Sequence, residues 1–185
     1  LREVVQVQNS DQPITGKLRG SIQFKDVSFV YPDSGIEGLK NINFNLNPGD
    51  KMAIIGRTGG GKTTIAELLL RNYDVNQGEI LIDGVDIRNH ELQNLRSRLG
   101  YVPQDSFLFS DTISKNVSFG NPDVNQAEIE KYCAYASIDS DIKELPEGYG
   151  TVVGERGVTL SGGQKQRISI ARALIKRPDM IILDD

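Results

Sequence analysis

The order of hydrophobic and polar positions predicts strands first and helices later in the chain. Three segments are rich in β-branched and aromatic residues, and we expect them to form an antiparallel β-subdomain: residues 22–31, 39–46 and 79–83. Between them, residues 51–55 form a short apolar run that ends at a glycine. Residues 64–70 then show helical spacing and good helix formers. This part of the chain is therefore expected to contain a strand, a glycine-rich loop and a helix.

The second half is predominantly helical by the same criterion. Turn residues interrupt a predicted helical insert, whose segments are residues 112–117, 125–136 and 140–144. Residues 166–176 place Ile168 and Ala171 on one helical face. Met180 to Asp184 is an apolar run that ends in a carboxylate, as expected of a buried parallel strand. The pattern predicts one α/β domain with a helical subdomain at about residues 106–160.

Composition limits the class of protein. With 185 residues and 38% hydrophobic content, the chain can bury one substantial core. No run approaches the roughly 18 apolar residues that a membrane-spanning helix needs. The net charge of −4 and the lack of a basic run argue against nucleic acid as a partner. The one cysteine, Cys133, excludes an internal disulfide and is expected to pack in the core.

Two polar stretches are interpreted as surface features. Residues 1–20 are polar, contain Pro13, Gly16 and Gly20, and are predicted to be a linker from a membrane domain into a domain at residues 21–185. The only histidine, His90, precedes a short helical pattern, so we place it at the surface or at the start of a helix.

The glycines after the apolar run form a candidate phosphate-binding loop. The sequence Gly56-Arg57-Thr58-Gly59-Gly60-Gly61-Lys62-Thr63 matches the pattern G-x-x-x-x-G-K-[ST]. Glycines let backbone N–H groups approach a triphosphate without side chains in the way. The helix N-terminus adds positive charge, Lys62 can reach the β and γ oxygens, and the Thr63 hydroxyl can bind magnesium. Thr64 is placed for a phosphate nearer the ribose, and a plain glycine turn is the alternative.

A second glycine string, Leu160-Ser161-Gly162-Gly163-Gln164, precedes the predicted helix at residues 166–176. A helix start of this kind attracts anions, although a simple glycine-rich cap is the other interpretation. Together with the P-loop, the string resembles the signature motif of ABC-type ATPases. The resemblance implies a P-loop NTPase (RecA-like) core with an antiparallel β-subdomain and an α-helical subdomain. It also implies that two such domains enclose two ATP molecules, with Ser161 to Gln164 directed at the partner's ATP.

Other elements of the ABC pattern occur in order. Tyr31 stands where the family stacks an aromatic ring on adenine, but a buried strand aromatic is also possible. Tyr101-Val102-Pro103-Gln104 resembles the Q-loop, in which Gln104 would approach magnesium and the attacking water. Asp184 resembles the Walker B aspartate that holds magnesium. The resemblance thus assigns catalysis to Lys62, Gln104 and Asp185, and Mg²⁺ to Thr63, Gln104 and Asp184.

Asp185 departs from the family pattern, which has glutamate after the Walker B aspartate. The shorter side chain withdraws the carboxylate, and a displacement of about one ångström can cost on the order of a hundredfold in rate. A hydrolysis-impaired switch subunit of a heterodimeric exporter is therefore an alternative to an active ATPase. An introduced glutamate-to-aspartate change, or an aspartate that serves adequately in a homodimer, would also account for this residue.

The segment Thr151 to Gly157 resembles a loop of ABC exporters that touches the membrane domain, although Glu155 and Arg156 are also compatible with a solvated charge pair. With the signature beside it, the segment favours an exporter over a soluble ABC ATPase. The resemblance then implies a second ATP-binding domain and an N-terminally fused transmembrane domain as partners. It places the protein at the cytoplasmic face of the plasma or inner membrane.

Overall fold

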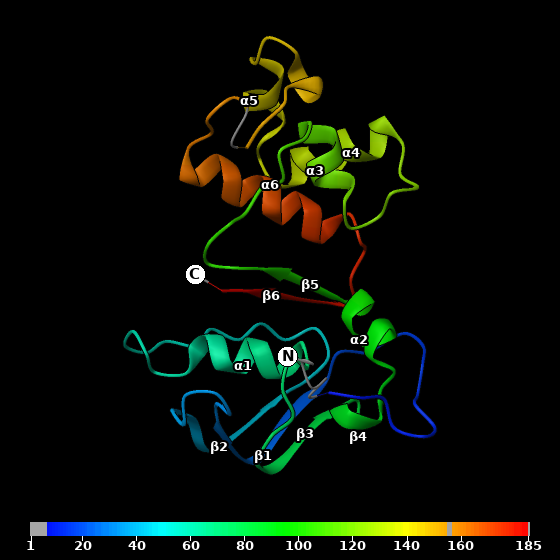
Figure 1. Ribbon diagram of the computed structural model, residues 1–185. Coiled ribbons are helices and arrows are strands. Elements are labelled where there is room, and N and C mark those ends of the chain that lie inside the picture. The colour runs from blue at the N-terminus through cyan, green and yellow to red at the C-terminus, as the bar shows by residue number, and fades with distance from the viewer. Residues whose placement is uncertain (1–6, 155–156, 185) are drawn as a thin grey trace, which may run out of the picture. The chain divides into compact units, whose positions relative to one another are not determined.

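A computed structural model describes residues 7–154 and 157–184, and the chain divides into two compact units at Leu99 and Gly100. The first unit contains an antiparallel sheet with short helices, and the second contains a helical cluster and a strand pair (Figure 1).

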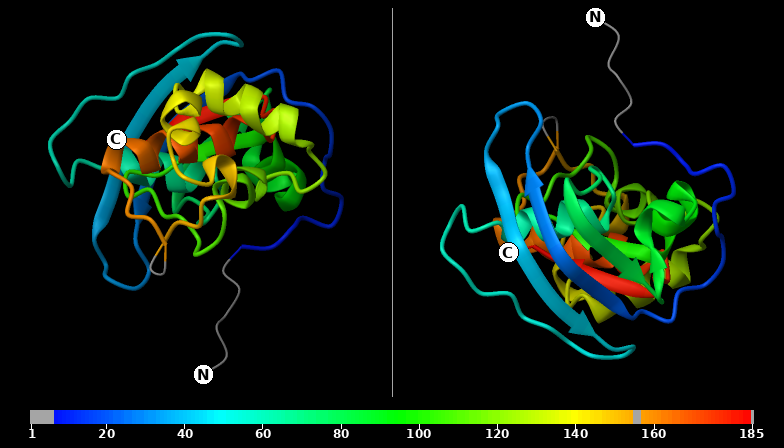
Figure 2. Two further views of the ribbon diagram at one scale, coloured as in Figure 1. Left: turned by 90° about the horizontal axis from the view of Figure 1, so that it is seen from above. Right: turned by 90° about the horizontal axis from the view of Figure 1, so that it is seen from below.

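The sheet of the first unit has four strands in the order β2-β1-β3-β4. Their bounds are β1 Ile22–Val30, β2 Glu37–Leu46, β3 Gln77–Ile82 and β4 Val85–Asp86. All neighbouring strands are antiparallel, and β1 and β2 run side by side as long curved strands (Figure 2). Phe24 lies opposite Phe44 on one side and Ile80 on the other, which places large apolar side chains in one layer. The predicted β-subdomain is therefore confirmed.

The helices of the first unit are short. They are α1 Lys62–Leu69, the 3₁₀ turn η1 Ile87–Asn89, and α2 Leu92–Arg98. Leu68 of α1 and Leu95 of α2 are almost fully buried, so each helix contributes its apolar face to the core of this unit. Glu91 caps α2, because its carboxylate accepts hydrogen bonds from the N–H groups of Gln93 and Asn94.

The strand predicted at residues 51–55 is wrong. These residues form no strand in the described part of the chain, and Ile55 is 94% exposed. An apolar run becomes a strand only when neighbouring strands satisfy its N–H and C=O groups. In the described part of the first unit, no strand of the sheet pairs with this segment.

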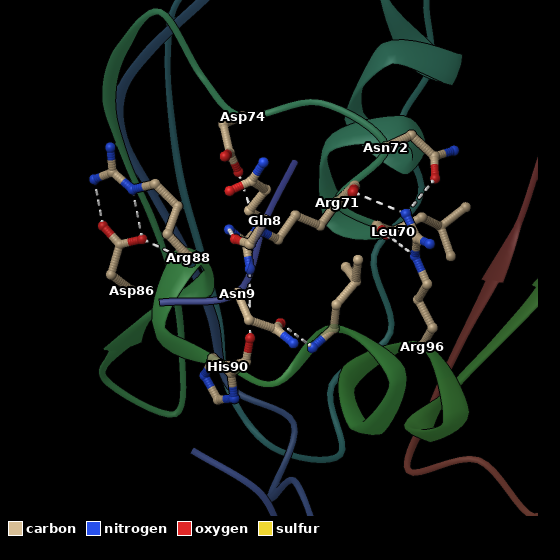
Figure 3. A network of polar contacts seen from close by, with 11 residues as sticks. Gln8, Asn9, Leu70, Arg71, Asn72, Asp74, Asp86, Arg88, His90 and Arg96 are labelled. Carbon is tan, nitrogen blue, oxygen red and sulfur yellow. Dashed lines mark hydrogen bonds and ion pairs between the residues drawn. The ribbon is translucent and has the colours of Figure 1, made fainter. Parts of the chain in front are cut away.

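From residue 8 onward, the polar stretch before β1 is hydrogen-bonded to the rest of the first unit at several points. Asn9 donates to Glu91 and accepts from the N–H of Leu92. The backbone carbonyl of Gln8 accepts from Arg71 (Figure 3). Further along, the backbone N–H groups of residues 19, 20 and 21 all donate to the carboxylate of Asp83. Residues 7–20 therefore pack on the unit, and the boundary placed at residue 20 stays a prediction.

His90 is not a surface residue as predicted. It is only 5% exposed, its Nε2 lies 3.3 Å from the carbonyl oxygen of Ile82, and its backbone bridges to Ile14. The polar neighbours that suggested exposure lie at the surface, while the ring turns inward to a carbonyl that it satisfies. The other half of the prediction holds, because His90 stands one residue before the cap of α2.

The second unit packs four α-helices and the turn η2 around one apolar cluster. The bounds are α3 Ile113–Ser118, α4 Gln126–Tyr135, α5 Asp139–Lys143, η2 Gly148–Gly150 and α6 Gly162–Leu174. Helices α3 and α4 both pack on α6 (Figure 1). Ile113, Ile142 and Ile168 meet in the cluster, which also holds Cys133 at zero exposure. The predicted helical subdomain and the packing role of Cys133 are confirmed.

Strands β5 (Leu99–Val102) and β6 (Met180–Leu183) form a two-stranded pair. The N–H of Asp184 extends it with a 3.0 Å hydrogen bond to the carbonyl of Val102. The prediction that residues 180–184 are buried is wrong for two of these five residues, because Ile181 and Leu183 are 48% and 63% exposed. A strand pair buries the side chains of one face only, so burial alternates along β6. Within residues 7–154 and 157–184, no helix combines the length and apolar character that crossing a bilayer requires.

Candidate functional site

The P-loop residues Gly56 to Gly61 connect directly to the first turn of α1. Gly59 and Gly61 have positive φ angles of 78° and 82°, which residues with a Cβ rarely adopt. At Gly61 a Cβ atom would also clash with the carbonyl oxygen of Gly38 on β2. Glycine at position 61 therefore lets the loop pass close to the edge of the sheet and start the helix. Gly56, Arg57, Thr58, Gly59 and Gly60 are all exposed along this turn.

Lys62 closes the loop on itself. Its Nζ donates to the carbonyl oxygens of Gly56 and Arg57, each at 3.0 Å, and the N–H of Gly60 donates to the same Arg57 carbonyl at 3.0 Å. The ammonium group is therefore held by the carbonyls at the start of the loop, those of Gly56 and Arg57, which precede Lys62 by six and five residues. A charged donor in this place can exchange the two carbonyls for phosphate oxygens without a change of the α1 backbone.

The threonines that follow differ in environment. Thr63 is exposed at the start of α1, whereas Thr64 is 4% exposed and its Oγ1 lies 2.9 Å from the hydroxyl of Tyr31. The Tyr31 ring also packs edge-on against Phe29 and Tyr73, with ring centroids 4.9 and 5.5 Å away. The structure thus joins Tyr31 to the P-loop helix through Thr64, which sequence reasoning did not predict.

The signature residues form the first turn of α6. Ser161 is its N-cap, and its Oγ accepts from the N–H of Gln164 at 3.3 Å. In return, Gln164 Oε1 accepts from the N–H of Ser161 at 3.0 Å, which completes a capping box. Gly162 and Gly163 lie exposed between them. The predicted helix start is confirmed, and it leaves the backbone N–H groups of the glycines at the surface.

The Q-loop and Walker B residues lie at the ends of the β5–β6 pair. Gln104 is exposed two residues beyond β5, and Asp184 directly follows β6 at 9% exposure. The hydroxyl of Tyr101, in β5, donates to the Asp184 carboxylate at 3.4 Å. Both candidate magnesium residues of this unit, Gln104 and Asp184, therefore follow the C-terminal ends of the two paired strands. Asp185, Glu155 and Arg156 lie outside the described residues, so the interpretations placed on them stay predictions.

Other contacts around the motifs were not predicted. Asp141 of α5 accepts from Gln164 and Arg167 of α6, at 3.2 and 2.6 Å. Asn116 of α3 is buried, hydrogen-bonds to the backbone of residues 109–112 and accepts from Arg172. Burial lowers the pKa of the Arg172 guanidinium. For the Asp141 contacts, the only signal in the sequence is the spacing of Gln164 and Arg167, which are three residues apart and therefore lie on one face of α6.

Comparison with known proteins agrees with the motifs. The family model described as "ABC transporter" matches residues 39–185, which is most of the chain. The chain belongs to the ABC transporter family. It is an ATP-binding domain of that family, with a P-loop NTPase fold of mixed α/β structure.

Similar proteins come from several organisms. The multidrug resistance-like ATP-binding protein MdlA of Escherichia coli is 45% identical over 185 residues, which are 100% of this chain and 31% of MdlA. The mitochondrial potassium channel ATP-binding subunit of Xenopus tropicalis is 49% identical over 91% of this chain and 25% of its own length. A bacterial Atm1-family ABC exporter solved with ATP bound is 43% identical with a TM-score of 0.91, over 98% of this chain and 32% of that one. The chain thus spans about a quarter to a third of these ABC proteins.

Proposed function

We propose that this chain binds and hydrolyses ATP as the motor domain of an ABC exporter. The observation that carries the proposal is the P-loop, whose exposed glycine backbone leads into α1 while Lys62 Nζ is held over the loop carbonyls. A triphosphate would take the place of those carbonyls as the partner of Lys62 and would accept hydrogen bonds from the loop N–H groups. Tyr31 would support the adenine and Thr64 the phosphates nearer the ribose.

The oxygen donors of the predicted metal site suit Mg²⁺, which prefers carboxylate, hydroxyl and phosphate oxygens. Thr63, Gln104 and Asp184 would hold the ion together with the nucleotide. When bound, Mg²⁺ neutralises charge on the phosphates during their transfer. The residues of this chain then orient the nucleotide, and Lys62 stabilises the charge that develops on the leaving oxygen.

Hydrolysis would be a direct displacement. A water oxygen bonds to the γ-phosphorus, the bond from that phosphorus to the β–γ bridging oxygen breaks, and ADP and inorganic phosphate result. Gln104 and Asp185 would position the water, and its proton would pass to the Asp185 carboxylate or to the phosphate. Nothing in the comparisons favours the hydrolysis-impaired alternative over this one.

The signature would act on a second ATP-binding domain, in a homodimer or a heterodimer. The exposed first turn of α6 is suited to bind the γ-phosphate of an ATP held by another P-loop, because helix N-termini attract anions. We also propose an N-terminally fused transmembrane domain that residues 1–20 link to this domain, a location at the cytoplasmic face of the membrane, and no nucleic acid partner. Substrate selection would belong to the membrane domain.

The test is Mg²⁺-dependent ATP hydrolysis by the full-length protein in lipid nanodiscs. Lys62→Ala removes the group held at the P-loop, so turnover should fall at least a hundredfold and nucleotide binding should weaken. The matched control is Lys40→Ala, because Lys40 is 80% exposed and pairs only loosely with Glu37, at 3.7 Å. A wild-type protein without activity, or equal activity of Lys62→Ala and wild type, would refute the proposal.

A further inference from the structure

The short helix α5 is joined to the signature turn through one carboxylate. Asp141 Oδ2 accepts from Gln164 Nε2 at 3.2 Å and from the Arg167 guanidinium at 2.6 Å. Gln164 belongs to the capping box that starts α6, and Arg167 lies one turn further along the same helix. The carboxylate therefore contacts both the first and the second turn of the signature helix.

The carboxylate also decides which way the Gln164 amide points. A glutamine amide has one oxygen that only accepts and one NH₂ group that only donates, and a carboxylate can pair with the NH₂ group alone. With Nε2 directed at Asp141, Oε1 must face the N–H of Ser161, which is the geometry of the capping box. A reversed amide would present its NH₂ group to the N–H of Ser161, and this half of the capping box would be lost, while the bond from the Gln164 N–H to Ser161 Oγ would remain.

Asp141 is itself held firmly. Its helix is anchored by Ile138 and Ile142, each 1% exposed in the apolar cluster. At the other side of α5, Asp139 accepts from the Tyr149 hydroxyl at 2.7 Å and pairs with Lys143 at 2.9 Å. The position of the Asp141 carboxylate thus follows from the packing of the helical subdomain.

We propose that Asp141 is a positioning residue that holds the signature turn in the conformation able to bind the partner's ATP. The inference rests on the proposed function, because it assigns Asp141 a role in the ATP site that the signature completes. The Asp141–Arg167 pair is one-third exposed on both sides, so it adds little to folding stability. Its effect falls on the orientation of a turn in which a displacement of about one ångström can matter a hundredfold.

The experiment compares full-length variants for kcat, KM, nucleotide affinity and melting temperature. Asp141→Ala should lower kcat about tenfold, because a mobile signature turn closes on ATP less often. The affinity of the P-loop for a fluorescent ATP analogue should stay within about twofold, since that site is on the other unit. Asp141→Asn retains an acceptor for Gln164 but loses the charge that pairs with Arg167. Its kcat should therefore lie between that of the wild type and that of Asp141→Ala.

Two further variants make the result specific. Glu144→Ala removes an exposed carboxylate from the end of the same helix and should keep the wild-type kcat. Arg167→Ala combined with Asp141→Ala should cost little more than Asp141→Ala alone, because both act through one contact.

The possible outcomes distinguish the role of Asp141 from the proposed ATPase function. A wild-type rate in Asp141→Ala, beside an inactive Lys62→Ala, would overturn the role of Asp141 and leave the ATPase proposal intact. A fall in kcat matched by an equal loss of P-loop affinity or by a large drop in melting temperature would mean a general structural role, which also overturns it. An inactive wild-type protein would refute the proposed function, and the inference would fall with it.

Discussion

The most severe test of the described packing is the replacement of Arg71 by methionine. Arg71 follows α1 and is 2% exposed, although it carries a full charge. Its Nε pairs with Asp74 at 3.0 Å, one terminal nitrogen donates to the Gln8 carbonyl at 2.7 Å, and the other to the His90 carbonyl at 3.4 Å (Figure 3). One guanidinium thus joins the end of the P-loop helix to the polar stretch before β1 and to the segment before α2.

The magnitude follows from these contacts. Methionine keeps much of the buried volume but leaves Asp74 and two carbonyls without their donor. Removal of one partner from a buried ion pair costs about 3–5 kcal/mol. Because the Asp74 side chain is 31% exposed and can be rehydrated, we take about 3 kcal/mol, at the lower end of that range. At about 2–4 °C per kcal/mol for a domain of this length, the melting temperature should fall by about 6–12 °C.

Differential scanning fluorimetry of the full-length protein would measure the shift, with Arg88→Met as the matched control. Arg88 pairs with Asp86 at 2.6 Å, but its side chain is 46% exposed, and such surface pairs contribute about 0–1 kcal/mol. The control should therefore melt within about 4 °C of wild type. Equal melting temperatures for Arg71→Met and Arg88→Met would show that the buried network does not stabilise the domain, and the reasoning would be refuted.

Two other predictions concern single side chains. Burial raises the pKa of the Cys133 thiol from 9.0 to about 11, so its thiolate fraction at pH 8 falls. Labelling of Cys133 by iodoacetamide, followed by mass spectrometry, should therefore be on the order of a hundredfold slower in the native protein than in urea-unfolded protein. Equal labelling rates would contradict this burial. Asp185→Glu should change the ATPase rate of the full-length protein by less than about tenfold if Asp185 positions water adequately, whereas a gain near a hundredfold would favour the hydrolysis-impaired alternative.

The two motif-bearing helices were predictable because their signals are local. A serine followed three residues later by glutamine specifies a capping box without help from the rest of the fold, and Ser161 and Gln164 form one. In the same way, Gly59 and Gly61 adopt the positive φ angles that a tight loop into a helix requires. Three strands of the β-subdomain, β1, β2 and β3, followed from composition, with errors of at most two residues at their ends, whereas the two-residue strand β4 was not predicted.

Local signals failed where burial depends on distant partners. The apolar run at residues 51–55 has the composition of a strand, but pairing with another strand decides whether it becomes one. His90 sits among polar residues, yet the acceptor that draws it inward is the carbonyl of Ile82 on a different element. In both cases, burial depends on a partner outside the segment itself: a neighbouring strand for residues 51–55 and the Ile82 carbonyl for His90.

The same distinction explains why the residues that bind a ligand are easier to find than those that orient them. A phosphate-binding loop must present consecutive N–H groups, so its requirement is written in consecutive residues. The carboxylate that fixes Gln164 needs only to reach the first turns of α6, and here it comes from Asp141, 23 residues earlier along the chain. Any element packed beside α6 can supply such a group. The signature string therefore specifies a capped turn, while the rigidity of that turn depends on how the helical subdomain packs against it.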